Sequence, residues 1–325
     1  LETYAPVMAI HKQDKTCDNE RFRPMSVGRL PHGGYAVASE TCALNTLGCV
    51  DIDEVRPGEI VTLHGAEIHR RQALTPAANE SRCTFEFVYF SRPDSVWAGR
   101  NVHHVRQRLG EELARESGVE ADVVIPVPDS GNYAALGFSL ESGIPYEMAF
   151  VRNHYVGRSF LQPTQWIRDF NVRVKLNLIA DLVRDKRVVI VDDSLVRGTT
   201  SQSRVTSLKQ AGAREVHLLI SCPPHRHACV YGIDFPERSK LMAATHSLDE
   251  IRKYLNADSL GYLSLEGMVK AVGAPQDSFC LACYNGDYPV PYSPLLEKHV
   301  MERRASRTES FSESFQKAER QRKLL

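Results

Sequence analysis

The chain has 325 residues, of which 42% are hydrophobic and 25% are charged, a length that allows two ordinary domains. Its 40 Lys and Arg residues balance 40 Asp and Glu residues, so the chain has no global positive field for holding nucleic acid. No stretch approaches about 18 consecutive apolar residues, and residues 1–20 lack the basic start and apolar run of a secretory signal. We expect a soluble globular protein.

The first part of the chain is predicted to be rich in β-structure. The stretches GGYAVASE (33–40) and PGEIVTLH (57–64) are short apolar runs between Gly and Pro, which is typical of β-hairpins. The polar stretch 70–82 indicates a linker, and TFEFVYF at 84–90 predicts a strand that follows it.

Beyond residue 101 the pattern indicates alternating strands and helices. Three apolar runs, VVIPVP (123–128), RVVIVDD (187–193) and VHLLIS (216–221), predict strands buried on both faces. Such alternation is typical of right-handed βαβ units around a parallel sheet. The charged tail 301–325 is expected to be frayed or a surface helix. Helices are predicted over 102–118, 132–143, about 201–211, 247–257 and 264–273.

The stretch RVVIVDDSLVRGTTSQS (187–203) carries the clearest chemical signal. A buried strand would deliver Asp192 and Asp193 to its carboxyl end, which is where open α/β sheets bind ligands. Converging backbone N–H groups, hydroxyls and a following helix N-terminus favour an anion in the next loop. A phosphate beside two carboxylates predicts a sugar phosphate, because carboxylates can accept hydrogen bonds from a ribose diol. The predicted phosphate loop contains Ser194, Arg197, Gly198, Thr199 and Thr200.

Three other interpretations compete for this stretch. A nucleotide-hydrolysing site would need a G-x-x-x-x-G-K-[ST] loop, which occurs nowhere in the sequence. An acidic receiver-type pocket does not call for the RGTT loop, and a capped turn with two solvated Asp side chains is the plainest alternative. We favour the phosphoribosyl interpretation.

The stretch VVIVDDSLVRGTTS resembles the phosphoribosyl pyrophosphate (PRPP) signature of type I phosphoribosyltransferases. With VIPVPDSGNYAALGFSLESGIPYE, RNHYVGRSFLQPTQ, CPPHRHACVYGID and SFCLACYNGDYP, the chain from about residue 20 to 300 resembles the glutamine PRPP amidotransferases, or amidophosphoribosyltransferases. The resemblance implies an α/β fold with a type I phosphoribosyltransferase parallel sheet and flanking helices. It also implies three regions, which are a glutaminase remnant at 1–72, the phosphoribosyltransferase domain at 73–300 and the tail at 301–325.

The resemblance implies an activity and the residues that carry it. Such enzymes form 5-phosphoribosylamine and pyrophosphate from PRPP and glutamine-derived ammonia, the first step of de novo purine biosynthesis. The implied Mg²⁺ site contains Ser130, Asp192 and Asp193, and Ser194–Thr200 would hold the 5-phosphate. The segment 152–165 matches a flexible segment that closes over PRPP in the family. Three basic residues of this segment, Arg152, His154 and Arg158, could approach the pyrophosphate. Arg152 is the candidate catalytic residue among them.

Eight cysteines in a chain of this length are too sparse for a disulfide scaffold. The C-x-x-C pattern alone leaves zinc, redox and cluster sites open. The resemblance implies a [4Fe–4S] cluster with a structural role, since PRPP substitution moves no electrons. His225 and His227 are interpreted as surface residues or as neighbours of the ligands, and the other cysteines as ordinary buried or free thiols. The four implied cluster ligands are Cys83, Cys229, Cys280 and Cys283.

The family's glutaminase nucleophile is an N-terminal Cys, whereas this sequence begins with Leu1, and residues 22–70 resemble only the last part of that domain. We therefore expect no glutaminase activity and at best the use of free ammonia. The chain is interpreted as a fragment, or as an incomplete gene model or a degenerate relative. The main alternative function is a non-catalytic or degenerate PRPP-binding protein, and a nucleobase salvage enzyme is a further one. The resemblance implies a homo-oligomer, a dimer or tetramer, that is inhibited by purine nucleotides and located in the cytoplasm or a plastid.

Overall fold

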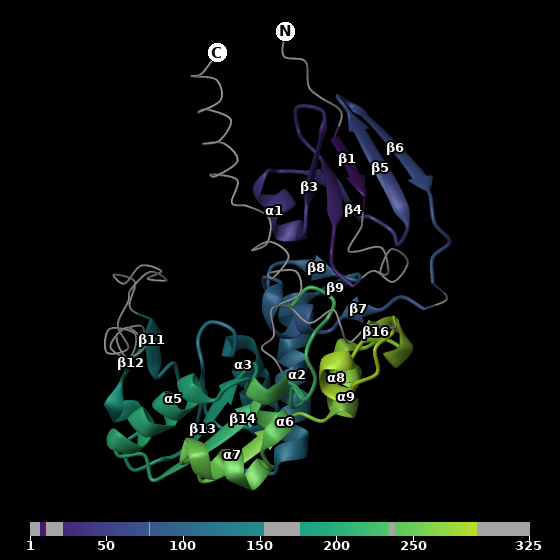
Figure 1. The fold of residues 1–325 in the computed structure, drawn as a ribbon. Helices are drawn as coiled ribbons and strands as arrows, with labels where there is room; N and C mark the ends of the chain where they lie inside the picture. Colours follow the sequence, from purple (N-terminus) through teal and green to yellow (C-terminus); the bar gives the residue numbers. More distant parts are fainter. Residues whose placement is uncertain (1–6, 11–21, 78, 153–175, 234–237, 291–325) are drawn as a thin grey trace, which may run out of the picture. The chain divides into compact units, whose positions relative to one another are not determined.

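The computed structural model describes residues 7–10, 22–77, 79–152, 176–233 and 238–290 (Figure 1). The compact unit Leu1–Pro289 is considered below. The charged tail lies outside the described residues, and the boundaries after residues 72 and 300 stay predictions. Within the described ranges, no helix combines the length and the apolar character that crossing a bilayer would require.

Two antiparallel sheets form the first part of the chain, as the hairpin patterns predict. The sheet β3-β2-β4 contains Ser26–Arg29 (β2), Tyr35–Ala38 (β3) and Val50–Glu54 (β4), and a short helix, Thr41–Thr46 (α1), precedes β4. The sheet β1-β5-β6 contains Val7–Ile10 (β1), Glu59–His64 (β5) and Glu67–Gln72 (β6). Because β6 extends to Gln72, the polar stretch is irregular only from residue 73. A small core joins the two sheets through Val27, Val55, Val61 and Leu63.

A four-stranded parallel sheet forms the centre of the second part, in the order β10-β13-β14-β15. The three strands predicted from apolar runs are Val123–Pro126 (β10), Arg187–Asp192 (β13) and Glu215–Ile220 (β14). The fourth, Ser259–Tyr262 (β15), was not predicted, because its SLGY sequence lacks an apolar run. Ile190 pairs with Ile125 on one side and Leu218 on the other, so the centre of the sheet is aliphatic.

The predicted helices are confirmed with small shifts of their ends. The longest ends at Gly118, which has the left-handed backbone typical of a helix C-terminus. The helix after Ser247 opens with a capping box, in which the Ser247 hydroxyl accepts from the Glu250 N–H and the Glu250 carboxylate accepts from the Ser247 N–H. The helices are Val102–Ser117 (α2), Asn132–Ser142 (α3), Thr199–Gln210 (α5), Met242–Thr245 (α6), Leu248–Leu255 (α7), Leu265–Val272 (α8) and Ala282–Asn285 (α9).

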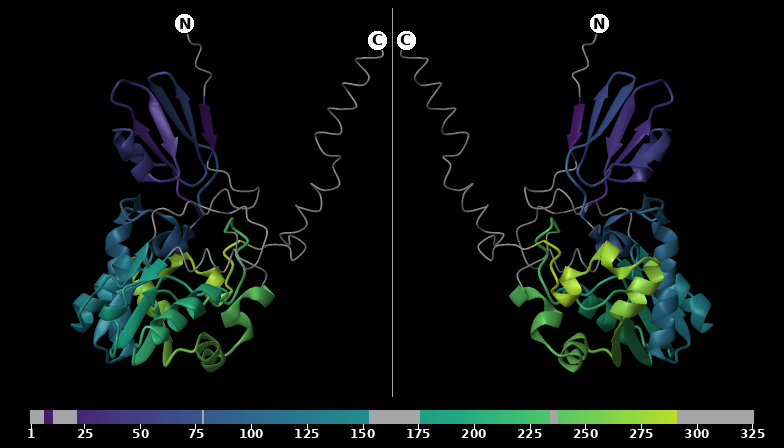
Figure 2. Two further views of the ribbon diagram at one scale, coloured as in Figure 1. Left: turned by 90° about the vertical axis from the view of Figure 1, so that its left-hand side faces the viewer. Right: turned by 90° about the vertical axis from the view of Figure 1, so that its right-hand side faces the viewer.

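The direction of the crossovers reverses between β10 and β13. From β10 the chain passes through α3 to Tyr146, which bridges Val124 along one edge of β10, whereas β13 pairs along the other edge. Right-handed crossovers in opposite directions place their helices on opposite faces, so α3 packs with α2 and α5 packs with α7. The views in Figure 2 show α2 (blue) and α7 (green) on opposite sides of the strands. The reversal creates a topological switch point at the carboxyl ends of β10 and β13, where such sheets bind ligands.

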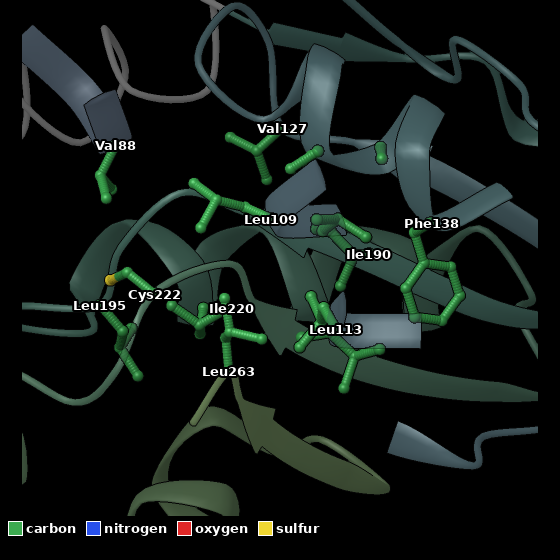
Figure 3. Packing of buried hydrophobic residues seen from close by; sticks show 14 of the residues in the cluster. Val88, Leu109, Leu113, Val127, Phe138, Ile190, Leu195, Ile220, Cys222 and Leu263 are labelled. Atoms are coloured by element: carbon green, nitrogen blue, oxygen red, sulfur yellow. The ribbon is translucent and has the colours of Figure 1, made fainter. Parts of the chain in front are cut away.

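One continuous core fixes these layers. Leu109 and Leu113 of α2, Phe138 of α3 and Ile190 of β13 are fully buried in it (Figure 3). Full burial of each such side chain contributes roughly 1.5–3 kcal/mol. Leu195 belongs to the same core, which anchors the loop that follows the two aspartates.

The predicted strand at 84–90 is wrong. Residues 86–90 form a π-helical turn, Glu86–Phe90 (η1), and the consecutive residues Phe87 and Val88 are both buried, unlike the alternation of a half-buried strand. The turn brings Ser91 back to Glu86. The Ser91 N–H donates to the Glu86 backbone carbonyl at 3.1 Å, and the Ser91 hydroxyl donates to the Glu86 carboxylate at 2.8 Å. The buried Arg106 donates to the carbonyls of Phe87 and Ser91, both at 2.7 Å. Tertiary hydrogen bonds therefore override the strand propensity of this aromatic run.

The remaining short elements include two strand pairs that matter for the site. The antiparallel pair β11-β12 ends at Arg152, and the parallel pair β16-β7 joins Cys83 to Cys280. These strands are Arg82–Cys83 (β7), Val96–Trp97 (β8), Arg100–Asn101 (β9), Phe150–Arg152 (β11), Leu176–Leu178 (β12) and Phe279–Cys280 (β16), and the 3-10 turns are Ala180–Leu182, Arg238–Lys240 and Gln276–Ser278.

Candidate phosphoribosyl site and cysteine pocket

Two adjacent carboxylates lie where β13 ends, at the switch point. Asp192 and Asp193 are only 4% and 6% exposed, so neither is a solvated surface acid. Burial and the neighbouring Asp193 carboxylate raise the pKa of Asp192, while the Arg204 guanidinium opposes that rise. The burial of both acids argues against a capped turn with two solvated side chains, because buried acids need compensating cations or polar partners.

Ser130, the third residue of the predicted Mg²⁺ site, lies next to this pair on the neighbouring loop. The loop follows β10, and the Ser130 hydroxyl donates to Oδ1 of Asp193 at 2.9 Å. The Ser194 hydroxyl donates to Oδ2 of the same carboxylate at 3.0 Å. The predicted oxygen donors Ser130, Asp192 and Asp193 are therefore gathered at one point.

The predicted phosphate loop connects β13 to α5. Arg197, Thr199 and Thr200 are exposed, and the N–H groups of the first turn of α5 lie at the end of the loop. Gly198 has φ +76°, and a Cβ there would lie 2.9 Å from both Cε and Sδ of Met242. The Met242 N–H also donates to the Val196 carbonyl at 3.0 Å, so α6 supports the loop directly.

Sequence reasoning missed Arg204, a cation that contacts this pair of carboxylates. Its Nη1 donates to Oδ2 of Asp192 at 2.8 Å, and the two side chains are only 17% and 5% exposed. The signal that could have found it is a single Arg on the helix that directly follows the two aspartates. Helix propensity alone gives no reason to expect that its side chain reaches back to the strand end.

Arg152 ends β11 and forms an ion pair with Asp129, which precedes Ser130 in the loop after β10. Sequence reasoning did not identify Asp129 as a partner. Arg152 therefore lies beside the loop that supplies Ser130, but its side chain is more than half exposed. His154, Arg158 and the rest of the predicted closing segment lie outside the described residues.

The four cysteines named as cluster ligands line one pocket. Cys83 and Cys280 are register partners in β7 and β16, Cys283 lies in α9, and Cys229 follows the loop after β14. The lining is otherwise apolar or aromatic and consists of Phe22, Tyr231, Ile233, Ala282 and Tyr288.

Hydrogen bonds hold the loop containing Cys229 against α9. The N–H groups of Arg226 and His227 donate to the Cys283 carbonyl at 3.0 and 3.1 Å. The Tyr288 hydroxyl donates to the Ala228 carbonyl at 2.6 Å. The pocket wall is thus fixed on the side that Cys229 supplies.

Of the two interpretations of His225, a surface position is wrong, whereas a position next to the cluster ligands stays a prediction. Its side chain is 1% exposed and lies between the rings of Phe85 and Tyr284, with centroid distances of 5.0 and 4.8 Å. Cys222, Cys42 and Cys49 are buried free thiols, as predicted, and Cys17 lies outside the described residues.

The pocket disfavours bare thiolates. Burial, and secondarily the other cysteines, raise the pKa of Cys283, while burial and Glu86 raise that of Cys83. No three Cys, His, Asp or Glu side chains of the described residues converge closely enough to share a single metal ion. A cubic cluster differs from such a site, because each thiolate binds its own iron at a separate corner.

The parallel sheet, the switch point and the loop from β13 to α5 define a type I phosphoribosyltransferase-like fold. No family model matches the chain. The solved structure of glutamine PRPP amidotransferase from B. subtilis, complexed with ADP and GMP, superposes with a TM-score of 0.78 at 46% identity, covering 86% of this chain and 62% of that one. A second structure, titled as the allosteric regulatory enzyme of purine biosynthesis, gives a TM-score of 0.79 at 46% identity over 87% of this chain and 62% of that chain.

The sequence is similar to amidophosphoribosyltransferases. It is 47% identical to the Bacillus subtilis enzyme over 88% of this chain and 60% of that protein. It is 46% identical to the chloroplastic enzyme 2 of Arabidopsis thaliana over 84% of this chain and 48% of that protein. The chain thus spans about half to three fifths of the length of these relatives. The predicted fold class is confirmed by these structural matches.

Proposed function

We propose that the chain carries the phosphoribosyl-transfer site of an amidophosphoribosyltransferase, which forms 5-phosphoribosylamine and pyrophosphate from PRPP and ammonia. In the complete reaction ammonia derives from glutamine, and the proposal for this chain is restricted to the transfer step. The observation that carries it is the gathering of Ser130, Asp192 and Asp193 beside the β13–α5 loop. The identity of about 46% to amidophosphoribosyltransferases supports the choice of acceptor.

Each part of the site then has a role in binding PRPP. The N–H groups and hydroxyls from Ser194 to Thr200 bind the 5-phosphate, because a helix N-terminus and a curled loop present donors to an anion. The carboxylates of Asp192 and Asp193 accept hydrogen bonds from the ribose hydroxyls. Arg152 approaches the pyrophosphate once it leaves Asp129, and its charge stabilises the leaving group.

The reaction makes modest demands on acid–base groups. Pyrophosphate leaves the anomeric carbon through an oxocarbenium-like transition state, as in glycoside chemistry. Ammonia is already a nucleophile, so no strong general base is needed. Positioning of PRPP and stabilisation of separating charges supply most of the catalysis.

The donor set fits Mg²⁺, since two carboxylates and a hydroxyl are oxygen ligands of the kind this ion prefers. We include Ser130, Asp192 and Asp193 in the proposed site, with PRPP oxygens and water completing the coordination. Bound there, Mg²⁺ would neutralise the charge of the departing pyrophosphate. The hydroxyl hydrogen bonds to Asp193 would open to admit the ion.

We further propose a structural [4Fe–4S] cluster held by Cys83, Cys229, Cys280 and Cys283. Four cysteines lining one largely apolar pocket match the ligand set of such clusters. The cluster would join three segments that are distant in the sequence. A cluster also accounts for the grouping of thiols whose deprotonated forms repel each other.

Regulation, assembly and location are proposed from the relatives. The B. subtilis structure contains ADP and GMP, so purine nucleotides are the proposed inhibitors of this protein. We propose a homo-oligomer, either a dimer or a tetramer, with no nucleic-acid or membrane partner. The relatives include bacterial and chloroplastic enzymes, so the proposed location is the cytoplasm or a plastid.

The proposal is tested by measuring which molecule accepts the phosphoribosyl group, ammonia or a purine base. Anaerobically purified protein is given PRPP and Mg²⁺ with either ammonia or a purine base, and release of pyrophosphate is measured. We expect release with ammonia and no nucleotide formation from bases. Release only with bases would indicate a salvage enzyme, and PRPP binding without turnover would indicate the non-catalytic PRPP-binding alternative.

A further inference from the structure

The two adjacent aspartates differ in the groups that hold them. Both oxygens of Asp193 accept from hydroxyls, those of Ser130 and Ser194, at 2.9 and 3.0 Å. Asp192 accepts from the Asp193 N–H at 3.1 Å and from Arg204 at 2.8 Å. One carboxylate thus has two rotatable neutral partners, whereas the other has a backbone donor and a cation.

Arg204 has a side chain that is largely buried beside Asp192. It lies on α5, its side chain is 17% exposed, and its Nε is buried without a hydrogen-bond partner among the residues that the structure describes. Removing one partner of such a buried pair is more damaging than losing a surface ion pair, because the remaining charge is left uncompensated.

The nearby Arg106 does not share this role. Its guanidinium is buried and its charge interacts through space with Asp193, but its donors contact the carbonyls of Phe87 and Ser91 and neither aspartate. Of these two buried guanidinium groups, Arg204 alone contacts one of the two carboxylates.

We propose that Arg204 is a positioning residue that fixes Asp192 and compensates its charge, leaving Asp193 as the carboxylate that binds Mg²⁺ and substrate. This inference rests on the proposed function, and it narrows the donor set proposed above. In this assignment Asp192 is held in place by Arg204, and Asp193 is the carboxylate available to a ligand.

Electrostatics and ligand chemistry both support this division. A divalent cation at Asp192 would meet the positive charge of a guanidinium bonded to the same carboxylate. Around Asp193, the Ser130 and Ser194 hydroxyls can rotate away, and their oxygens are themselves acceptable Mg²⁺ ligands. Removing a group that orients a metal or substrate ligand, as Arg204 would orient Asp192, typically lowers activity or metal affinity by about 10- to 100-fold.

The test compares R204M, R204K, D192N, D193N and the double variant D192N/R204M in the ammonia-dependent assay. The matched control is K209M, which removes another ion pair of α5, the pair with Asp258, away from the aspartates. Thermal melting and circular dichroism check folding, and R204Q replaces R204M if that variant does not melt cooperatively. PRPP and Mg²⁺ are each titrated, so that KM, kcat and the half-saturating Mg²⁺ concentration are separated.

We expect R204M to lower kcat/KM for PRPP by about 10- to 100-fold, R204K to recover part of the loss, and K209M to match the unmodified protein. The double variant D192N/R204M should lose little more kcat/KM than D192N alone, since Arg204 acts through Asp192. The half-saturating Mg²⁺ concentration should rise strongly in D193N and little in D192N or R204M. Normal kinetics in R204M, additive losses in the double variant, or a larger Mg²⁺ shift in D192N than in D193N would overturn the assignment. An inactive unmodified protein would instead count against the proposed function.

Discussion

Cys83 and Cys280 are register partners in two neighbouring parallel strands, although one lies early and the other near the end of the described chain. The Thr84 hydroxyl donates to the Cys280 carbonyl at 3.2 Å and reinforces the pair. The chain therefore brings both thiols to one pocket through backbone pairing, before any metal is considered. Such preorganisation is what a structural metal centre requires of its ligands.

Replacing Cys280 and Cys283 by Ala should remove the proposed cluster. We expect about four iron atoms per chain in the unmodified protein and almost none in the double variant, with loss of the visible absorbance band. The free energy of unfolding should fall by several kcal/mol, because a structural metal centre stabilises only the folded state. Iron and sulfide analysis and anaerobic thermal melting measure both effects.

The control for this prediction is C42A/C49A, which removes two buried thiols outside the pocket. This variant should retain its iron. Equal iron loss in both variants, or iron-free unmodified protein after anaerobic purification, would contradict the proposed cluster.

Gly198→Ala should weaken PRPP binding more than it weakens the fold. The φ of +76° costs Ala roughly 1–2 kcal/mol, and the new Cβ would lie 2.9 Å from Cε and Sδ of Met242, so that the end of this side chain or the proposed phosphate loop must shift. Gly143→Ala is the matched control, since its φ is +75° and nothing lies within 4 Å of a Cβ there. We expect G198A to lower kcat/KM for PRPP by about 10- to 100-fold, while G143A loses stability only. Equal kinetics in the two variants would argue against a role for this loop in binding.

His225 predicts a pH dependence of stability. Burial lowers the pKa of His225 to about 3, so the unfolded chain binds the proton first as pH falls below its ordinary value of 6.5. This group therefore destabilises the fold increasingly from about pH 6.5 down to about pH 3, by up to roughly 1.4 kcal/mol per pH unit. H225L should show a shallower decline in denaturant unfolding, whereas H69L, which replaces an exposed His, should keep the original slope. An unchanged slope in H225L would show that His225 is not held neutral.

Most of the second part of the fold was predictable because local signals agreed. Apolar runs of the right length predict β10, β13 and β14, and Ser247 and Gly118 mark the ends of their helices. The pair Asp192 and Asp193 and the loop after it were also found, because chemistry and position lie in one continuous stretch.

The sequence-based predictions fail where contacts between residues distant in the sequence determine the local structure. The run 84–90 has strand propensity, yet the buried Arg106 and Glu86 impose a π-helical turn. Arg204 was missed because its role depends on a helix folding back over β13, and His225 because only Phe85 and Tyr284 reveal its burial.

The most direct test of the central claim is ammonia-dependent release of pyrophosphate from PRPP and Mg²⁺, comparing the unmodified protein with D192N/D193N. A matched control, D249N, removes an exposed carboxylate on α7 that forms ion pairs with Arg252 and Lys253 of the same helix. The account predicts release in the unmodified protein and D249N, and a loss of at least about 100-fold in a D192N/D193N variant that still melts cooperatively. Undiminished release in the folded D192N/D193N variant would contradict the assignment of the phosphoribosyl site to the end of β13.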